Sequence, residues 1–273
     1  MKAYVFPGQG SQKTGMGQDL YNEVSESRAL FKKANKILNF NITELMFEGT
    51  DEDLLQTKVT QPAIFIHSTI LALTSKTSAP DVCAGHSLGE FSALVASNAI
   101  SFEDGLKLVS IRANAMQKAC QDTNGTMAAI LGLSDKIIES SCSEIDGVVK
   151  PANYNCPGQL VISGEIKSVE KACEILMEKG ARRALILPVS GAFHSELMSS
   201  AVNDLKKGID ETEFTKPSCP IYQNFTGYPE QEPAKIKINL LNQLTGAVLW
   251  NQSINKMIEE DHEMIRINKM KQE

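Results

Sequence analysis

The chain has 273 residues, of which 42% are hydrophobic and 22% are charged, and its formal net charge is −6. This composition is sufficient for one large core with a smaller inserted unit, and it excludes an intrinsically disordered chain. The acidic balance provides no basic field, so we expect neither nucleic acid nor a membrane surface as a partner. The first residues lack the pattern of a signal peptide, and no apolar run reaches membrane-spanning length.

Six cysteines are scattered along the chain without a Cys-x-x-Cys pair. This spacing is typical of separate thiols in a reducing compartment, and it indicates neither a disulfide framework nor a zinc site. We therefore expect a cytoplasmic protein that holds no metal.

Short apolar runs alternate with helical stretches, which predicts an α/β fold with parallel strands. Residues 3–6 have the pattern of a strand, and an amphipathic helix is expected over residues 20–38. A further helix is expected to carry Pro62 in its first turn, where proline is tolerated. Ser101 precedes two acidic residues and resembles the N-cap of a helix that includes Arg112.

The pattern changes between residues 126 and 189, where strand, helix, strand, strand, helix and strand follow one another. That order is typical of a ferredoxin-like unit. We therefore predict a larger core made of residues 1–125 and 190–273, and a small inserted subdomain of residues 126–189.

Residues 85–89 read Gly-His-Ser-Leu-Gly, a Gly-x-Ser-x-Gly motif between a short apolar run and the start of a helix. A strand, a tight turn and a helix in this order form a nucleophile elbow, which exposes the hydroxyl of its serine. Ser87 is therefore the candidate nucleophile. The same turn directs the backbone N–H of Leu88 towards the place where an oxyanion would form.

A serine hydroxyl needs a base to remove its proton, and the chain has four histidines. His194 is the candidate base, because it follows a predicted strand at a position where parallel sheets present active groups. His86 is adjacent to Ser87 in the elbow, and adjacent side chains diverge. We expect His67 to be a core histidine and His262 to face solvent.

Four motifs occur in a characteristic order along the chain. They are Gly-Gln-Gly-Ser-Gln at residues 8–12, the elbow with the glutamate that follows it, Ser-Gly-Ala-Phe-His-Ser at residues 190–195, and Gln-Leu-Thr at residues 243–245. Together they resemble the malonyl-CoA:acyl carrier protein transacylase family, from residue 3 to about residue 258. The resemblance implies an α/β-hydrolase-like core with a mostly parallel sheet and an inserted ferredoxin-like subdomain.

The resemblance also implies a reaction and its machinery. A malonyl group would pass from malonyl-CoA to the phosphopantetheine thiol of acyl carrier protein through a malonyl-serine intermediate, with no cofactor beyond the CoA substrate. Gln243 would orient His194 through its backbone carbonyl. The backbone N–H groups of Gln9 and Leu88 would form the oxyanion hole.

Four further residues gain roles in recognition from the resemblance. Arg112 would bind the malonyl carboxylate, for which a guanidinium offers two parallel hydrogen bonds. Phe193 would crowd the branched α-carbon of a methylmalonyl group. Arg182 and Arg183 match basic positions that would contact acyl carrier protein. We expect the enzyme to be a monomer.

The C-terminal part departs from the family pattern. Members normally continue with a strand and a Gly-Pro-Gly turn before a final helix, but here neither glycine nor proline follows Gly246. Residues 264–269 resemble the final helix, so we expect the strand and its turn to be missing, through a true deletion or an absent stretch of sequence. Such a loss would expose an edge of the sheet.

The sequence leaves two alternatives open. A serine esterase or thioesterase of the α/β-hydrolase class shares the elbow but expects an acid between serine and histidine in chain order. Asp135 and Asp146 lie in that interval, within the predicted insert. The second alternative is an acyl-carrier docking protein whose activity is impaired by the altered tail.

Overall fold

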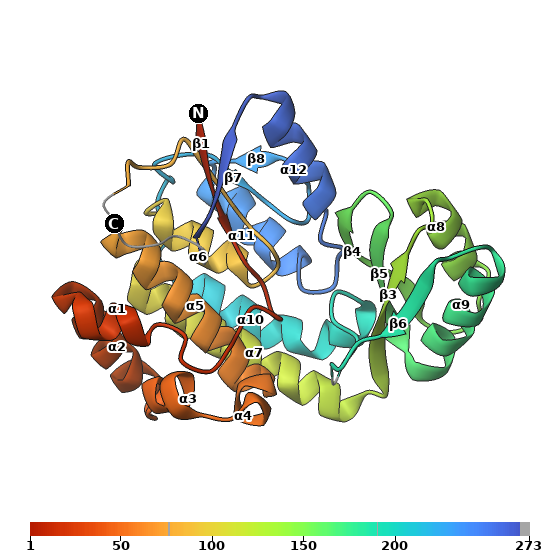
Figure 1. The fold of residues 1–273 in the computed structure, drawn as a ribbon, viewed down its shortest axis with the longest axis horizontal. Coiled ribbons are helices and arrows are strands. Elements are labelled where there is room, and N and C mark those ends of the chain that lie inside the picture. Colours follow the sequence, from red (N-terminus) through yellow and green to blue (C-terminus); the bar gives the residue numbers. More distant parts are fainter. Residues whose placement is uncertain (76, 190, 268–273) are drawn as a thin grey trace.

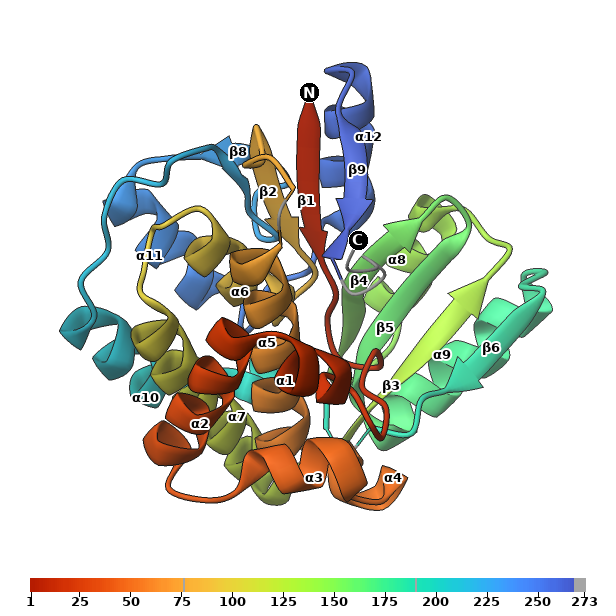
Figure 2. The ribbon, with the colours of Figure 1, turned by 60° about the vertical axis from the view of Figure 1, so that its left-hand side comes forward.

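The computed structural model describes residues 1–75, 77–189 and 191–267. The chain has an α/β fold built on two separate sheets, with helices packed against each of them (Figure 1). Helix α6 (Gly89–Ala96) packs against strands β1 (Lys2–Phe6) and β2 (Val82–Gly85) of the larger sheet, whereas the smaller sheet and its two helices lie to one side of it (Figure 2). No helix within these described ranges is long and apolar enough to span a bilayer.

The larger sheet has the strand order β8-β7-β2-β1-β9. Its neighbouring strands are parallel except for β7 and β8, which are antiparallel. Phe6 at the end of β1 lies opposite Gly85 at the end of β2, so the loops that follow these strands start side by side. The strands are β1 (Lys2–Phe6), β2 (Val82–Gly85), β7 (Ile221–Tyr222), β8 (Pro229–Glu230) and β9 (Glu263–Arg266).

The helices around this sheet bury a large apolar core that includes Phe6, Phe65 and Phe91, each 0–1% exposed. Helices α5, α6 and α7 contact one another within this core, and α5 and α7 carry side chains towards the cavity described below. The helices are α1 (Gln18–Glu23), α2 (Ser25–Leu38), α3 (Ile42–Glu48), α4 (Asp51–Leu55), α5 (Thr57–Thr74), α6 (Gly89–Ala96), α7 (Phe102–Asp122), α10 (Ser199–Glu211), α11 (Pro233–Asn242) and α12 (Trp250–Glu259), with a 3-10 turn at Glu196–Met198.

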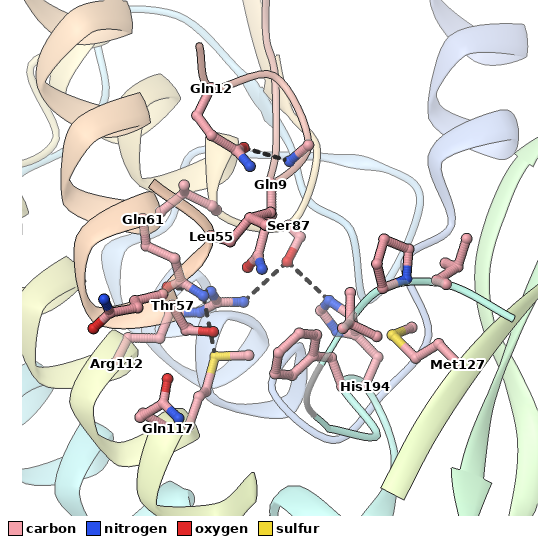
Figure 3. A pocket seen from close by; sticks show the side chains of 18 of the residues that line it. Gln9, Gln12, Leu55, Thr57, Gln61, Ser87, Arg112, Gln117, Met127 and His194 are labelled. Atoms are coloured by element: carbon pink, nitrogen blue, oxygen red, sulfur yellow. Dashed lines mark hydrogen bonds between the residues drawn. The ribbon is translucent and has the colours of Figure 1, made fainter. Parts of the chain in front are cut away.

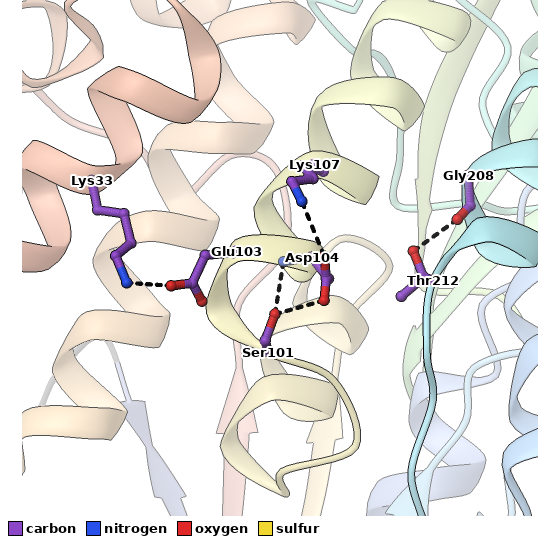
Figure 4. Close-up of polar contacts among 7 residues, drawn as sticks. All are labelled: Lys33, Ser101, Glu103, Asp104, Lys107, Gly208 and Thr212. Carbon is purple, nitrogen blue, oxygen red and sulfur yellow. Dashed lines mark hydrogen bonds and ion pairs between the residues drawn. The ribbon is translucent and has the colours of Figure 1, made fainter.

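Helix α7 begins where the sequence predicts (Figure 4). The Ser101 hydroxyl accepts a hydrogen bond from the backbone N–H of Asp104 at 3.0 Å, which caps the first turn. Glu103 in the same turn forms an ion pair with Lys33 of α2. These contacts fix the start of the helix that carries Arg112.

The smaller sheet is antiparallel throughout, with the order β4-β5-β3-β6. Two helices pack against it around a separate apolar core. Strand β4 is also joined to the larger part, because the backbone N–H of Tyr154 donates to the carbonyl of Val248 at 3.0 Å. The elements are β3 (Gly125–Leu131), α8 (Asp135–Ser143), β4 (Val149–Cys156), β5 (Gln159–Glu165), α9 (Ile166–Glu178) and β6 (Arg183–Ile186).

Two helix boundaries differ from the prediction. The single helix expected over residues 20–38 is divided into α1 and α2 by Val24, which is extended (φ −117°, ψ 116°). The break lets both helices bury an apolar side chain, Leu20 on α1 and Phe31 on α2. Helix α5 begins at Thr57, so Pro62 lies inside the helix and removes one backbone donor there.

The expectation of a missing strand is wrong. Glu263–Arg266 form β9, parallel to β1, with Lys2 opposite Glu263 and Val5 opposite Arg266. The turn before β9 contains Asp261 at a positive φ of 57°, which aspartate tolerates better than most residues. Strand β9 therefore covers the edge of β1 that the deletion would have exposed. Residues 268 and 269 of the expected final helix lie outside the described residues.

Candidate active site

The nucleophile elbow connects β2 to α6, as its motif predicts. Ser87 has a positive φ of 51°, which is strained for a residue with a side chain. A Cβ atom at Gly85 would lie 1.9 Å from the backbone carbon of Gly89, so only glycine fits there. Asn224 clamps the turn, since its Oδ1 accepts from the Ser87 N–H at 2.5 Å and its Nδ2 donates to the Gly85 carbonyl at 2.6 Å.

The side chains of Ser87 and His194 point towards one another (Figure 3). The Ser87 Oγ lies 2.8 Å from Nε2 of His194, and Nδ1 of His194 lies 2.8 Å from the backbone carbonyl oxygen of Gln243. A carbonyl can only accept, so Nδ1 carries the ring proton and Nε2 is left to accept. The serine hydroxyl therefore donates to Nε2, the geometry that proton removal requires.

His194 is 3% exposed, and its surroundings keep the ring neutral. Burial lowers the pKa of His194 to about 3, and the positive charge of Arg112 contributes to the decrease. The imidazole is thus unprotonated at neutral pH and available as a base.

Arg112 projects from α7 into the same site and is 1% exposed. Its NH1 donates to Oε1 of Gln61 at 2.7 Å. Its NH2 donates to Oγ of Ser87 at 3.0 Å and to Oε1 of Gln243 at 3.2 Å. Burial lowers the pKa of Arg112 to about 10, which leaves the guanidinium charged at neutral pH. A buried cation held by neutral acceptors suits an incoming carboxylate.

The loop after β1 lies against the elbow. A Cβ atom at Gly8 would be 2.6 Å from the backbone oxygen of His86, so the two loops are in direct contact. The Gly10 N–H donates to Oε1 of Gln12 at 2.9 Å, which shapes the segment around Gln9. Gln9 and Leu88, whose N–H groups are the predicted oxyanion donors, both line the cavity in front of Ser87.

That cavity has a volume of about 760 Å³ and lies between the two parts of the fold. Ser87, Arg112 and Phe193 line it from the larger part, and Met127 and Asn153 line it from the strands of the smaller sheet. The space is of the size of a small-molecule site. It is large enough for an acyl group and part of the chain that carries it.

The acyl transferase domain family matches residues 3–267 of this chain. The chain belongs to this family. One curated relative, the malonyl CoA-acyl carrier protein transacylase of Bacillus subtilis (strain 168), is 43% identical over 263 residues, covering 94% of this chain and 83% of the relative. The protein of that name from Staphylococcus aureus (strain MRSA252) is 40% identical over 265 residues, covering 95% and 86%.

Solved structures of acyl transferases superpose on nearly all of this chain. An acyl carrier protein S-malonyltransferase from Vibrio cholerae superposes with a TM-score of 0.93 at 40% identity, covering 97% of this chain and 89% of that one. A chain from the structure of a type II PKS acyl-carrier protein in complex with its malonyl-transacylase superposes with a TM-score of 0.93 at 36% identity. The match covers 97% of this chain and 88% of that one.

The other histidines of this acyl transferase do not face Ser87. The Nε2 atom of His86 lies 2.9 Å from Oδ1 of Asn155, so this ring links the elbow to β4. His67 lies partly buried on α5. The expectation that His262 faces solvent is wrong, because it is 8% exposed in the turn before β9.

Arg182 and Arg183 are exposed at the start of β6, and neither is among the residues that line the cavity. Three other residues beside the elbow have no role in the sequence-based hypothesis, although each is 0% exposed and polar: Glu90, Gln223 and Asn224. Gln223 and Asn224 directly follow strand β7, and polar residues at the carboxyl end of a strand are a signal that could have found them.

Proposed function

We propose that this protein transfers a malonyl group from malonyl-CoA to acyl carrier protein through a malonyl-serine intermediate. One observation carries the proposal: Oγ of Ser87 lies 2.8 Å from Nε2 of His194 and 3.0 Å from NH2 of Arg112. The nucleophilic oxygen thus contacts both a base and a cation that can bind a carboxylate. The names of the relatives support the same substrates.

In the first half-reaction, the Ser87 oxygen attacks the thioester carbonyl while Nε2 of His194 takes its proton. The N–H groups of Gln9 and Leu88 stabilise the oxyanion of the tetrahedral intermediate. When the carbon–sulfur bond breaks, the imidazolium returns its proton to the leaving sulfur. CoA departs as a thiol and the malonyl group remains as an ester of Ser87.

The second half-reaction runs through the same groups in reverse. The phosphopantetheine thiol of acyl carrier protein loses its proton to His194 and attacks the ester carbonyl. The Ser87 oxygen leaves, recovers the proton, and the malonyl thioester of the carrier is formed. As written, the exchange needs neither metal nor cofactor, and CoA is a substrate.

Arg112 gives the exchange its preference for a dicarboxylic acyl group. A malonyl carboxylate can receive two parallel hydrogen bonds from the guanidinium. An acetyl group would leave the buried guanidinium without a carboxylate in direct contact, which is unfavourable. The ring of Phe193, 7% exposed at the cavity wall, would crowd a branched α-carbon.

We further propose that the larger part is an α/β-hydrolase-like core and that residues 126–189 form an inserted ferredoxin-like subdomain. The strand order β4-β5-β3-β6 with two helices supports the second assignment. Arg182 and Arg183 on its surface are proposed contacts for an acidic carrier protein. Monomeric state and cytoplasmic location remain predictions.

The positions of the acidic residues support the esterase alternative less well than they support malonyl transfer. Asp135 begins α8 and Asp146 precedes β4, so both acids lie in the smaller part. The group on Nδ1 of His194 is the carbonyl of Gln243 and not a carboxylate. The argument for an impaired docking protein rested on a missing strand, and β9 removes that argument.

Incubation with malonyl-CoA, followed by intact mass and peptide mapping, tests the proposal. We expect one malonyl group per chain, on the peptide that contains Ser87, and none on the Ser87→Ala variant. A label on another residue, or a folded parent chain that takes no label, would overturn the proposal.

A further inference from the structure

Glu90 is a buried carboxylate five residues after the end of β2, on the first turn of α6. It is 0% exposed, and its two oxygens accept three hydrogen bonds. Oε1 accepts from Nε2 of Gln223 at 3.0 Å. Oε2 accepts from the Asn224 N–H at 2.9 Å and from Nε2 of Gln243 at 3.0 Å.

All three partners of Glu90 are N–H donors, which favours the ionised carboxylate. Burial raises the pKa of Glu90, whereas these donors and the charge of Arg112 act in the opposite direction. The carboxylate also raises the pKa of Arg112, so each charge offsets part of the desolvation of the other.

The side-chain amide of Gln243 lies between these two charges. Its Nε2 donates to Glu90 and, at 3.0 Å, to the backbone carbonyl of Ser87. Its Oε1 accepts from NH2 of Arg112 at 3.2 Å. A carboxylate cannot donate, so the amide cannot turn over without placing its oxygen against Glu90 and its NH₂ group against the guanidinium. The negative charge thereby determines which end of the amide faces Arg112.

The backbone of the same residue holds the base, since the Gln243 carbonyl accepts from Nδ1 of His194 at 2.8 Å. We propose that Glu90 is the positioning residue that fixes Gln243, and through it both the orientation of His194 and the position of Arg112. The part that concerns Arg112 rests on the proposed malonyl specificity. The part that concerns His194 requires only that Ser87 is an activated serine.

The Glu90→Gln variant separates the two parts, because glutamine keeps the shape, removes the charge and lets the Gln243 amide turn over. The first readout is the rate at which a fluorophosphonate probe labels Ser87, which depends on the serine and its base and on no thioester. We expect this rate to fall by roughly tenfold, the effect of losing a charge-assisted hydrogen bond. The second readout is the ratio of malonyl-CoA to acetyl-CoA in the single-turnover acylation of Ser87, and we expect it to fall by roughly threefold or more.

The matched control is Glu170→Gln, the same exchange at an exposed position of α9. We expect it to change neither readout. Thermal unfolding of each variant shows whether the fold is retained. If Glu90→Gln does not fold, Glu90→Asp replaces it. Aspartate keeps the charge but is one methylene group shorter, so its carboxylate lies farther from the Gln243 amide. We expect the labelling rate and the malonyl-to-acetyl ratio to fall in this variant as well.

A folded Glu90→Gln variant with the parent's labelling rate would overturn the part of the inference that concerns His194. An unchanged malonyl-to-acetyl ratio would overturn the part that concerns Arg112. Both results together, with equal losses for the two thioesters, would indicate a purely structural role. If the parent chain accepts neither thioester, the proposed function fails. The fluorophosphonate rate still decides the role of Glu90 in that case.

Discussion

The cavity and the outer edge of the smaller sheet place their polar residues in opposite surroundings. At the cavity, Arg112, His194 and Gln243 are at most 3% exposed and bonded to one another or to Ser87. At the outer edge, Arg183 begins a strand whose Leu185 and Ile186 are 47% and 51% exposed.

The buried residues at the cavity act on the reaction itself, whereas the exposed residues at the outer edge act on how a partner protein binds. A buried charge interacts strongly with each neighbour, so removing one partner leaves the others uncompensated. An exposed charge is screened by water and salt, and it affects how partners meet more than how they react. Substitutions at the cavity should therefore affect the transfer reaction most, and substitutions at the outer edge should affect it least.

The largest loss is expected for His194→Ala, which removes the base. General base catalysis contributes on the order of a thousandfold, so kcat for transfer to acyl carrier protein should fall by about that factor. Steady-state transfer assays measure this, with His67→Ala, outside the cavity lining, as the control. A variant that keeps a tenth of the parent's kcat would exclude His194 as the base.

Arg112→Ala should be the next in size and should depend on the donor. Losing a paired guanidinium is expected to lower kcat/KM for malonyl-CoA by roughly a hundredfold, with a smaller loss for acetyl-CoA. Acylation assays with both donors give the ratio. Equal losses for the two thioesters would mean that Arg112 does not recognise the carboxylate.

The pH dependence should reflect the depressed pKa of His194. Because that pKa is about 3, well below the usual 6.5, kcat/KM should show no loss from His194 protonation between pH 8 and pH 6.5 and should fall only under more acidic conditions. Removing the charge of Arg112 should raise the pKa of His194, so the acid limb of Arg112→Ala should move to higher pH. A parent acid limb at or above pH 6.5 would contradict the described burial.

The same shift has a consequence for stability. Above pH 6.5 both the folded and the unfolded chain have this imidazole unprotonated. As the pH falls from 6.5 towards about 3, only the unfolded chain takes up the proton, so this group's contribution to the free energy of unfolding is lost. Urea unfolding of the parent and His194→Gln at two pH values measures the difference, and identical slopes with pH would refute it.

The smallest effect is expected at the outer edge. Arg183→Ser should raise KM for acyl carrier protein by a few-fold, leave kcat unchanged, and lose its effect at high salt, because the residue is exposed and screened. Titration of the carrier at low and high ionic strength measures this. An effect on the malonyl-CoA half-reaction alone would place Arg183 outside the carrier interface.

The sequence could predict the residues that local motifs carry. Ser87 lies in a strand–turn–helix motif, and His194 follows an apolar run, so their neighbourhoods indicate their geometry. Glu90 and Asn224 could not be assigned in this way, because their partners are distant in the chain: Asn224 bonds Ser87 across 137 positions, and Glu90 bonds Gln243 across 153. Strand β9 could not be recognised, because residues 264–269 resemble the final helix of the family and only the pairing of Glu263–Arg266 with β1 reveals a strand there.

The most direct test of the central claim follows the malonyl group after it has reached the enzyme. Malonyl-enzyme is prepared with malonyl-CoA, freed of CoA and mixed with phosphopantetheinylated acyl carrier protein, and the acyl group is traced by mass. We predict that the group leaves Ser87 and appears on the carrier thiol at a rate no slower than turnover, with little free malonate. Release of malonate without malonyl carrier would identify a hydrolase, and retention of the label on Ser87 would contradict the account.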